Sequence, residues 1–529
     1  MPFLTSDAAT QQIIAGTLIV LDGVSVRPSS GSAVVTSTST SGSATLFNYG
    51  NILSNAGPAI DWRAGNGAIF NDGVIGTGYY YSNRAITFNE LYIDDTFSIE
   101  NTANGQIIGG IDINGFPIDA GIPRPADNDA LITITNAGLI SAPMDIYDNN
   151  TNSAVRLIYM PADVVIENSG TISGETAIYW NSDFLSASSF SLHNSGDIIG
   201  TSGAAMSLYG SASLTLIEIV NSGRISSPDA RTIYVQGNAQ ITNTASGVIE
   251  GNIQMTSNGE QRLENAGEII GDVELTLDDD TVINSGAIRG SLDMGDDNDR
   301  YIDLGGLVSG TITMGDGDDL ARVAQDYLVI DGGTGNDTLI VTGDRVAASG
   351  FETIFLNGSA DISVDGGATD DKIWGNFGAN GINGGDGADT IRSGNGDDTV
   401  EGGAGADFLF GGAGNDEIVG GGGKDLMNGG SGEDIFVFEA VSDTGTTGGT
   451  ADIIKSFEHG VDRIDMSFLS NVTFIGTGAF SGGGAPEIRL QLLTNNNSRI
   501  WVDADGNGSA DMMITMLGQQ TFDAGDFIL

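Results

Sequence analysis

The sequence predicts an all-β protein: a right-handed parallel β-helix, or β-solenoid, that continues into a parallel β-roll and ends in a C-terminal β cap. Three observations support this prediction. An Asn-x-Gly motif recurs ten times in the N-terminal half, with a two-residue insertion before the glycine at Asn101 and Asn243; eight nonapeptides run without a gap over 366–437, and no segment has a convincing helical period. We expect the β-helix over 1–300, the roll over 301–437 and the cap over 438–529, as one continuous solenoid.

The N-terminal motif consists of an apolar run, an asparagine, a spacer, a glycine and then Ile or Val. Clear copies begin at Asn136, Asn168, Asn194 and Asn221, and successive asparagines lie 19 to 35 residues apart. Apolar runs such as 164–166 are typical of strands, and Asn-x-Gly is typical of turns. A strand-turn-strand unit of this length is one coil of a parallel β-helix. We expect Ile, Val and Leu inside, asparagines bonded along one corner, and loops that project around 112–130 and 142–160.

The nonapeptides follow the pattern G-G-x-G-x-D-x-U-x, in which U is a large apolar residue. Typical copies are GGDGADTIR (384–392) and GGAGNDEIV (411–419), whereas Thr369 and Asn380 depart from the pattern. Two units make one coil of 18 residues, so the sixth residues of every second unit stack. One edge then carries Asp371, Asp389, Asp407 and Asp425, and the other carries Asn380, Asp398, Asp416 and Asp434. This pattern resembles the calcium-binding repeat of the RTX family.

The chemistry of the repeat agrees with that resemblance. Stacked carboxylates about 5 Å apart repel one another by roughly 3 kcal/mol per pair at an effective dielectric constant near 20. Glycine lets loop carbonyls turn inward, and Ca²⁺ prefers six to eight carboxylate and carbonyl oxygens. Zinc would prefer Cys or His, but cysteine is absent and the two histidines, His193 and His459, lie on separate segments.

We therefore expect several Ca²⁺ ions, with a weaker site at Asn380. The candidate ligands are carboxylates at the sixth position and loop glycines that supply carbonyls. They are Asp319, Asp337, Asp371, Asp389, Asp398, Asp407, Asp416, Asp425 and Asp434, with Gly385, Gly387, Gly394, Gly396, Gly403, Gly405, Gly412 and Gly414. Upstream, Asp280 and Asp299 continue the spacing, either as further ligands or as an acidic corner that aids solubility.

The C-terminal third, 366–529, resembles the calcium-binding C-terminal domain of serralysin-type secreted proteins of the RTX family. Beyond the repeats, the shared motifs are D-x-F-V-F at 434–438, D-x-I-x-x-F at 452–457, G-x-D-x-I-D at 460–465, and the terminal Asp-Phe-Ile-Leu. The resemblance implies export through the type I secretion machinery by an uncleaved C-terminal signal. It also implies folding on extracellular calcium, with a secreted or cell-surface location.

Charge and composition exclude several classes of protein. The 529 residues include 70 Asp and Glu but only 19 Lys and Arg, which gives a formal net charge of −51 and argues against nucleic acid or anionic membranes as partners. Disulfides are excluded because cysteine is absent. Neither a cleaved signal peptide nor a membrane span is evident, so these signs alone would predict a cytosolic protein, a prediction that the C-terminal resemblance reverses.

A second candidate metal site is the run Asp503-Ala-Asp505-Gly-Asn507-Gly508, which fits the opening of an EF-hand loop. The twelfth position is Ile514 instead of the bidentate Glu. Both a calcium site and a polar hairpin remain open for 503–511.

Catalysis finds little support in the sequence. The H-E-x-x-H motif of the serralysin zinc protease is missing. Parallel β-helices with RTX repeats also occur among polysaccharide lyases and epimerases, but 1–371 contains no lysine and a single histidine to act as base. The acidic pairs Asp94-Asp95 and Asp145 with Asp148 are the candidates for hydrolysis. Trp62 with Tyr79-Tyr80-Tyr81 could either stack on sugars or pack beneath an N-terminal cap.

These observations favour a non-catalytic, calcium-binding solenoid with a structural, surface-layer or adhesive role. Self-association and cell-surface polysaccharide are the expected partners besides calcium and the secretion machinery. The alternative is a polysaccharide-modifying enzyme, a lyase, epimerase or hydrolase, that carries an RTX export module.

Overall fold

A computed structural model of the protein confirms the all-β prediction. It describes residues 3–4, 12–14, 17–27, 32–36, 43–54, 57–63, 66–77, 84–91, 96–115, 131–142, 153–160, 162–182, 188–210, 216–256, 259–324, 328–519 and 521–529. These residues form strands, turns and two short 3-10 helices, with no α-helix among them. They also include no helix with the length and apolar character of a membrane span.

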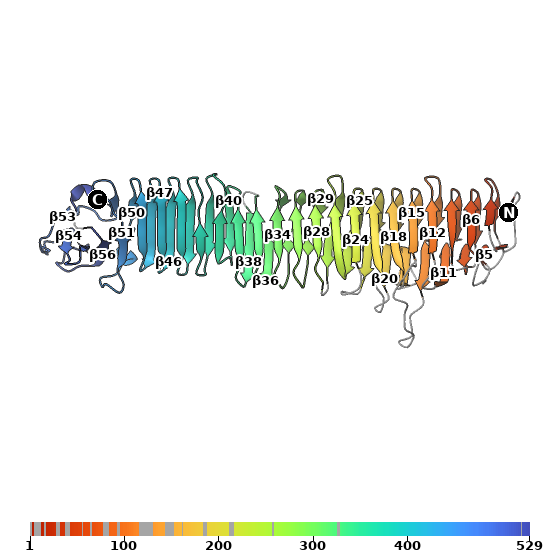
Figure 1. The fold of residues 1–529 in the computed structure, drawn as a ribbon, viewed down its shortest axis with the longest axis horizontal. Coiled ribbons are helices and arrows are strands. Elements are labelled where there is room, and N and C mark those ends of the chain that lie inside the picture. The colour runs from red at the N-terminus through yellow and green to blue at the C-terminus, as the bar shows by residue number, and fades with distance from the viewer. Residues whose placement is uncertain are drawn as a thin grey trace, which may run out of the picture. The chain divides into compact units, whose positions relative to one another are not determined.

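The chain divides into two compact units. The first comprises Met1–Asp296 with Gly306–Gly310, and the second comprises Asp297–Gly305 with Thr311–Leu529. Each unit is built from stacked coils whose strands pair in parallel with the equivalent strands of the neighbouring coils (Figure 1). The parallel solenoid architecture expected for both regions is therefore confirmed.

Each coil of the first unit contributes a strand to each of three sheets. The first sheet contains β1 (Phe3–Leu4), β3 (Thr17–Val20), β6 (Ala44–Asn48), β9 (Gly67–Asn71), β12 (Thr96–Asn101), β15 (Leu131–Asn136), β18 (Asp163–Asn168), β21 (Ser189–Asn194), β24 (Leu216–Asn221), β26 (Asn238–Asn243), β28 (Arg262–Asn265) and β31 (Thr281–Asn284). The second contains β4 (Ser25–Val26), β7 (Asn51–Ser54), β10 (Val74–Thr77), β13 (Gln106–Ile108), β16 (Leu139–Ser141), β19 (Thr171–Gly174), β22 (Asp197–Gly200), the first parts of β25 (Arg224–Gln236) and β27 (Val248–Met255), β29 (Glu268–Ile270), β32 (Ala287–Ile288) and β35 (Leu307–Val308).

The third sheet of the first unit closes the coil. It contains β2 (Gln12–Ile14), β5 (Val34–Thr36), β8 (Ile60–Trp62), β11 (Ile86–Leu91), β14 (Ile111–Gly115), β17 (Ser153–Met160), β20 (Thr176–Ser182), β23 (Met206–Tyr209), the second parts of β25 and β27, β30 (Val273–Glu274) and β33 (Leu292–Asp293). The expectation of projecting loops is wrong for 112–115 and 153–160, because β14 and β17 pair there over four residues. Residues 116–130 and 143–152 lie outside the described part of the chain.

Successive side chains of each strand point alternately outward and into the core of the unit. In the first sheet the inward residues Ile134, Ile166, Leu192 and Ile219 stand directly above one another and are fully buried. Since burial of such a side chain contributes about 1.5–3 kcal/mol, the stacked aliphatic column stabilises every coil on both sides.

A ladder of buried asparagines ends the ten strands of the first sheet from β6 to β31. The side-chain amide nitrogen Nδ2 of each asparagine donates to Oδ1 of the asparagine in the next coil, at 2.8–2.9 Å. The members are Asn48, Asn71, Asn101, Asn136, Asn168, Asn194, Asn221, Asn243, Asn265 and Asn284. An amide both donates and accepts, so the ladder satisfies its own buried groups, as the spacing predicts, except for Oδ1 of the first member, Asn48.

The glycine two residues beyond most of these asparagines is required by close packing between coils. A Cβ placed on Gly170 would lie 2.2 Å from the carbonyl oxygen of Gly138 in the previous coil. Any larger residue there would push the coils apart and break the ladder.

The second unit has two sheets, which we call sheet A and sheet B. Sheet A contains β34 (Arg300–Asp303), β37 (Leu320–Val323), β39 (Thr338–Val341), β41 (Thr353–Leu356), β43 (Lys372–Trp374), β45 (Thr390–Asn395), β47 (Phe408–Ala413), β49 (Leu426–Ser431) and β51 (Asp452–Lys455). Sheet B contains β36 (Ile312–Asp316), β38 (Leu328–Thr334), β40 (Arg345–Ser349), β42 (Ser363–Gly367), β44 (Gly381–Asp386), β46 (Thr399–Gly405), β48 (Glu417–Gly423), β50 (Ile435–Val437), β52 (Arg463–Asp465) and β57 (Phe527–Ile528).

The eighth residue of every nonapeptide fills the core between the two sheets, as the repeat predicts. These residues are at most 2 % exposed: Ile373, Ile382, Ile391, Val400, Leu409, Ile418, Met427 and Phe436. Register between neighbouring repeat coils is 18 residues, for example Leu409 opposite Met427.

The C-terminal part covers the last coil of the roll. It contains the 3-10 helices η1 (Val441–Asp443) and η2 (Ala524–Asp526), the short strand β53 (Thr473–Phe474), and the antiparallel strands β54 (Glu487–Leu492), β55 (Ser498–Asp503) and β56 (Met512–Leu517). Strand β56 pairs with β51, and β57 pairs with β52. The buried Asp526 accepts hydrogen bonds from the backbone nitrogen of Gly460 and from His459 Nδ1, which fixes the final residues to the cap.

The asparagine ladder generates a stability prediction. We expect Asn194→Ala to lower the free energy of unfolding of the first unit by about 2–4 kcal/mol, because Asn168 Nδ2 and Asn221 Oδ1 both lose buried partners. Urea unfolding followed by circular dichroism measures the change. The matched control is Asn104→Ala at an exposed turn, for which we expect less than about 0.5 kcal/mol. Equal effects of the two variants would contradict a stabilising role of the ladder.

Candidate metal centre

Two ladders of acidic side chains run along the edges of the second unit. In each ladder the backbone nitrogen of one residue donates to Oδ1 of the aspartate one coil further on. The first ladder links Asp371, Asp389, Asp407, Asp425 and Asp452 at 2.8–2.9 Å. The second ladder links Asn380, Asp398, Asp416, Asp434 and Asp462 at 2.7–3.1 Å.

The upstream candidates Asp319 and Asp337 belong to the same arrangement. Asp299 donates its backbone nitrogen to Asp319 Oδ1, and Asp319 donates to Asp337 Oδ1. The next coil is shorter, and Glu352 Oε2 takes the acceptor position for the nitrogen of Asp337.

The second carboxylate oxygen, Oδ2, is buried and has no hydrogen-bond partner in nine of the aspartates. These are Asp337, Asp371, Asp389, Asp398, Asp407, Asp416, Asp425, Asp434 and Asp452. A buried anionic oxygen with no compensating donor costs several kcal/mol, so a column of them must be neutralised by bound cations or by protons.

The glycine loops shape a cradle around these oxygens. A Cβ on the first glycine of a unit would lie 2.0–2.6 Å from Oδ2 of the aspartate in the same unit, as at Gly384, Gly402, Gly411, Gly420 and Gly429. All eight glycines named as candidates have φ between +103° and +155°, a region that other residues rarely adopt. Their loops stack so that a Cβ on Gly403 would lie 2.0 Å from the carbonyl oxygen of Gly385.

This arrangement fits calcium. Each loop brings together carboxylate oxygens with unused lone pairs and closely stacked main-chain carbonyls. Ca²⁺ accepts six to eight oxygen ligands of both kinds in a flexible geometry. Side chains of neighbouring coils, together with the loop carbonyls, would hold the ions between coils and neutralise the stacked negative charge.

Burial raises the pKa of the ladder aspartates well above the ordinary value of 3.8. The pKa of Asp337, Asp389, Asp407, Asp425 and Asp434 is about 6, that of Asp371 and Asp416 is about 7, and that of Asp452 is about 8. Loss of water is the main cause, hydrogen bonds with neighbouring groups oppose it, and charges of adjacent acids add to it. These groups resist ionisation until a cation balances them.

The two departures from the repeat alter their loops in different ways. Asn380 occupies its ladder position, but its Nδ2 donates to the carbonyls of Gly378 and Ser393. An amide nitrogen therefore stands where other units place an anionic oxygen, which supports the expectation of a weaker site. Thr369 Oγ1 donates to Asp371 Oδ1 at 2.9 Å, so it replaces the missing glycine without displacing the aspartate.

The sequence reasoning missed two ladder members, Asp452 and Asp462. They lie 27 and 28 residues after Asp425 and Asp434, because the segment that holds η1 interrupts the 18-residue period. Their only sequence signal was membership of the motifs D-x-I-x-x-F and G-x-D-x-I-D. Asp452 has the same buried, unpartnered Oδ2 as the repeats, whereas Asp462 Oδ2 accepts from the nitrogen of Glu458.

The upstream acid Asp280 is also buried, and burial raises its pKa to about 8. Its Oδ1 accepts from the backbone nitrogen of Gln261. Whether Asp280 and Asp299 bind calcium stays a prediction.

The run that resembles an EF-hand forms the turn of the β55–β56 hairpin. Carboxylate oxygens of Asp503, Asp505 and Asp511 lie within 4.8 Å of one another. The nitrogens of Asn507 and Gly508 donate to the buried Asp503. The hairpin geometry is confirmed, and calcium binding there stays a prediction.

The groups considered for sugar chemistry do not converge on a site. Trp62 is 1 % exposed and packs against Phe88 and Phe97, so the proposal that it stacks on sugars is wrong. The other candidates, Tyr79-Tyr80-Tyr81, Asp94-Asp95, Asp145 and Asp148, lie outside the described residues.

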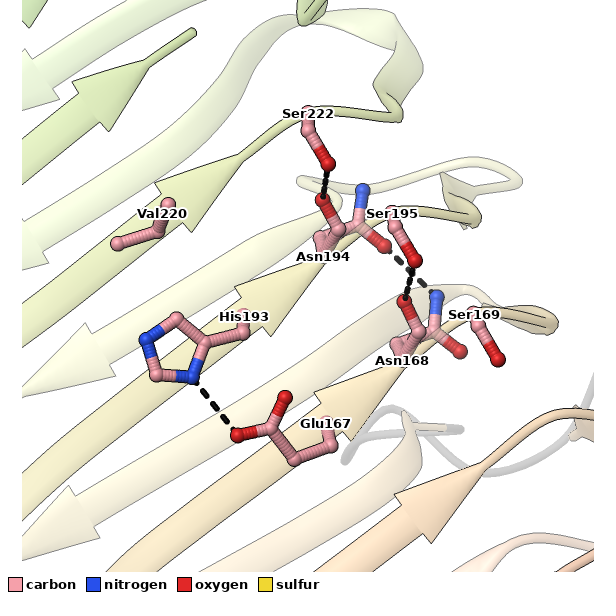
Figure 2. Close-up of a pocket in the computed structure, with 8 residues that line it drawn as sticks. All are labelled: Glu167, Asn168, Ser169, His193, Asn194, Ser195, Val220 and Ser222. Carbon is pink, nitrogen blue, oxygen red and sulfur yellow. Dashed lines mark hydrogen bonds and ion pairs between the residues drawn. The ribbon is translucent and has the colours of Figure 1, made fainter.

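Figure 2 shows a shallow surface groove of about 310 Å³ on the first unit, where His193 on β21 and Glu167 on β18 point toward each other. Their side chains are nearly half exposed, and His193 Nδ1 lies 2.8 Å from Glu167 Oε1. The groove is otherwise lined by the ladder residues Asn168 and Asn194, by Val220 and by serines. No cation lines it to neutralise a sugar carboxylate, which proton abstraction beside that group requires.

The stacked coils, glycine cradles and carboxylate ladders define an RTX-type β-roll. The family model of the serralysin C-terminal domain of M10 peptidases matches residues 158–529, and the chain belongs to this family. RTX repeats bind calcium, and serralysin-type domains are exported by type I secretion.

Metallopeptidase AprA of Pseudomonas marginalis is 36% identical over 87 residues, which are 16% of this chain and 17% of that protein. The chain therefore matches about a sixth of the length of this relative. Two solved structures are also similar, the AlgE6R3 and AlgE6R2 subunits of the mannuronan C5-epimerase of Azotobacter vinelandii. Their identities are 26% and 24%, they cover 30% and 32% of this chain and 78% and 91% of their own, and both TM-scores are 0.21.

The raised pKa values predict how pH affects the second unit in calcium-free buffer. Because the folded state binds more protons than the unfolded chain above pH 4, we expect its stability to fall as pH rises from about 4 to about 7. Millimolar calcium should remove this loss, since the metal takes the place of the protons. Urea unfolding at pH 4.5, 6.0 and 7.5, with and without calcium, measures both trends. Calcium-free stability that rises over this range would contradict the prediction.

One substitution distinguishes the effect of a buried carboxylate charge from that of its hydrogen bond in the aspartate ladder. Asp407→Asn keeps an Oδ1 acceptor for the nitrogen of Asp389 but removes the buried charge. We expect it to raise stability by about 1–3 kcal/mol without calcium and to reduce the stabilisation that calcium provides. Calcium titrations of unfolding free energy measure both effects.

The matched control for that variant is Asp386→Asn, at the exposed last residue of β44, in the nonapeptide one coil before that of Asp407. We expect it to change stability by less than about 0.5 kcal/mol in either condition. If Asp407→Asn lowered stability equally with and without calcium, Asp407 would not be a calcium ligand.

Proposed function

We propose that this chain is a secreted, non-catalytic β-solenoid that folds on extracellular calcium and serves a structural, surface-layer or adhesive role. The observation that carries this proposal is the double ladder of buried aspartates, nine of which have an Oδ2 without a hydrogen-bond partner. At neutral pH these oxygens need a cation to balance their charge.

The difference in calcium concentration between the cytosol and the exterior would make folding follow export. RTX-type sites with the affinity of extracellular modules, Kd of about 10⁻⁴–10⁻³ M, stay empty in the cytosol and fill outside the cell. Binding to the folded state alone contributes folding free energy, so the second unit would remain unfolded for export and fold after it. Membership of the serralysin C-terminal family supports this route.

A structural role agrees with the rest of the described residues. The groove at His193 and Glu167 has no lysine or arginine in its lining, and the open surface pocket at Glu260, Arg262 and Asp278 has no histidine, lysine or tyrosine to act as base. Stacked coils instead provide long regular surfaces, which favour self-association. We propose that the main partner of this chain is another copy of itself, and that cell-surface polysaccharide is a second partner.

Imaging of the full chain tests this function. We expect negative-stain electron microscopy and light scattering to show ordered assemblies in millimolar calcium, and chelation to disperse them and to lower the strand signal in circular dichroism. Folded monomers at all protein concentrations in calcium would contradict the self-assembling role. Release of unsaturated or shortened products from bacterial or algal polysaccharides would show the enzymatic alternative instead.

A further inference from the structure

We propose that the outer face of sheet A in the second unit is a lateral docking surface, and that its partner is the outer face of sheet B in a second copy of this chain. This inference rests on the proposed self-assembling function and identifies the surfaces that would perform it.

The outer face of sheet A has no negative charge. None of the outward-facing residues of β34, β37, β39, β41, β43, β45, β47, β49 and β51 is Asp or Glu, in a chain with 70 acidic residues. Five cations lie there instead: Arg300, Arg322, Lys372, Arg392 and Lys455. Since the chain has only 19 cations, this face is locally positive on a strongly acidic molecule.

Large apolar side chains occupy the positions between these cations. Phe355 is 39 % exposed and Phe408 is 52 % exposed, while Trp374 and Phe410 are partly exposed. An exposed apolar patch of this kind, surrounded by polar groups, marks a protein contact.

The outer face of sheet B is acidic from β42 to β48 and carries an exposed cation beyond each end of that stretch, Arg345 on β40 and Arg463 on β52. Within the stretch, Asp365, Glu401 and Glu417 are exposed on β42, β46 and β48, and β44 lies between β42 and β46. Between and beside them stand small residues, Ser363 and Gly381. Small residues leave room for the aromatic side chains of sheet A, and the carboxylates oppose its cations.

The two faces also share one spacing. Lys372 and Arg392 lie diagonally on the adjacent strands β43 and β45, and Glu401 and Glu417 lie diagonally on the adjacent strands β46 and β48. Each diagonal spans about 8 Å, because strands are about 4.8 Å apart and alternate residues about 6.6 Å apart. Charges can therefore pair coil by coil between two solenoids that lie side by side.

Ring orientation favours a protein partner over a sugar. Phe355 and Trp374 stack face to face, with centroids 4.8 Å apart and planes 16° apart, and Arg392 lies over Phe410 at 5.9 Å. The flat faces of these aromatic rings are therefore covered by side chains of neighbouring strands of sheet A. A sugar ring needs a free aromatic face, whereas ring edges pack well against the small side chains of another sheet.

A contact between unlike faces leaves one face free on each copy, sheet B on one and sheet A on the other. Such heterologous contacts propagate in rows instead of closing as dimers. The inference therefore predicts extended lateral assembly that depends on calcium through the fold of the second unit and weakens as salt screens the charges.

Reciprocal charge reversal tests the pairing of the two faces. We expect Lys372→Glu with Arg392→Glu to raise the concentration needed for half-assembly in calcium by more than tenfold, and Glu401→Lys with Glu417→Lys to do the same. An equimolar mixture of the two double variants should assemble again, because each altered face then meets its complement. Light scattering and electron microscopy provide the readout, and calcium-dependent circular dichroism verifies folding.

The matched control is Arg262→Glu with Arg289→Glu, which makes the same change in net charge on exposed positions of the first unit. It should assemble as the unaltered chain does. Normal assembly of either face variant, or failure of the mixture to recover, would overturn the pairing while leaving the proposed function intact. If the sheet A variant assembled normally but lost binding to polygalacturonate, the face would be a polysaccharide site. Absence of assembly by the unaltered, calcium-folded chain would instead refute the proposed function.

Discussion

A solenoid must satisfy, at every coil, the polar groups that its corners bury, and this chain meets that constraint with two different side chains. In the first unit the buried corner residue is asparagine, whose amide donates to the coil on one side and accepts from the other. In the second unit it is aspartate, which only accepts. Its Oδ1 takes a backbone nitrogen, and its Oδ2 remains unsatisfied until a cation arrives.

The change from amide to carboxylate changes what folding depends on. The asparagine ladder closes its own hydrogen bonds, so the first unit needs no external ligand at that corner. The aspartate ladders hold buried acids whose pKa is raised by loss of water, and the glycine loops leave no space for a side chain that could compensate. Under the proposed function calcium is part of the fold of the second unit, and the chain belongs to a family whose repeats bind calcium.

The two sheets of the second unit are alike in backbone and different in surface. In both sheets the eighth position of each nonapeptide is buried, so the core does not distinguish the two sheets by function. The outward positions are free to vary: sheet A carries cations and aromatic rings there, whereas sheet B carries carboxylates and small residues from β42 to β48. That separation is the basis for our inference that the solenoid builds lateral assemblies with itself.

Much of this structure was readable in the sequence, because its signals are periodic and local. The nonapeptide set the 18-residue register and the ladder members from Asp371 to Asp434, and Asn-x-Gly marked the buried corner of the first unit. Only the tertiary structure added Asp452, Asp462 and Glu352 to the ladders, since insertions and a shortened coil shift them out of period. It alone showed Trp62 buried, and it alone revealed the charge-segregated faces, because neighbours across coils are set by backbone pairing between residues far apart in the chain.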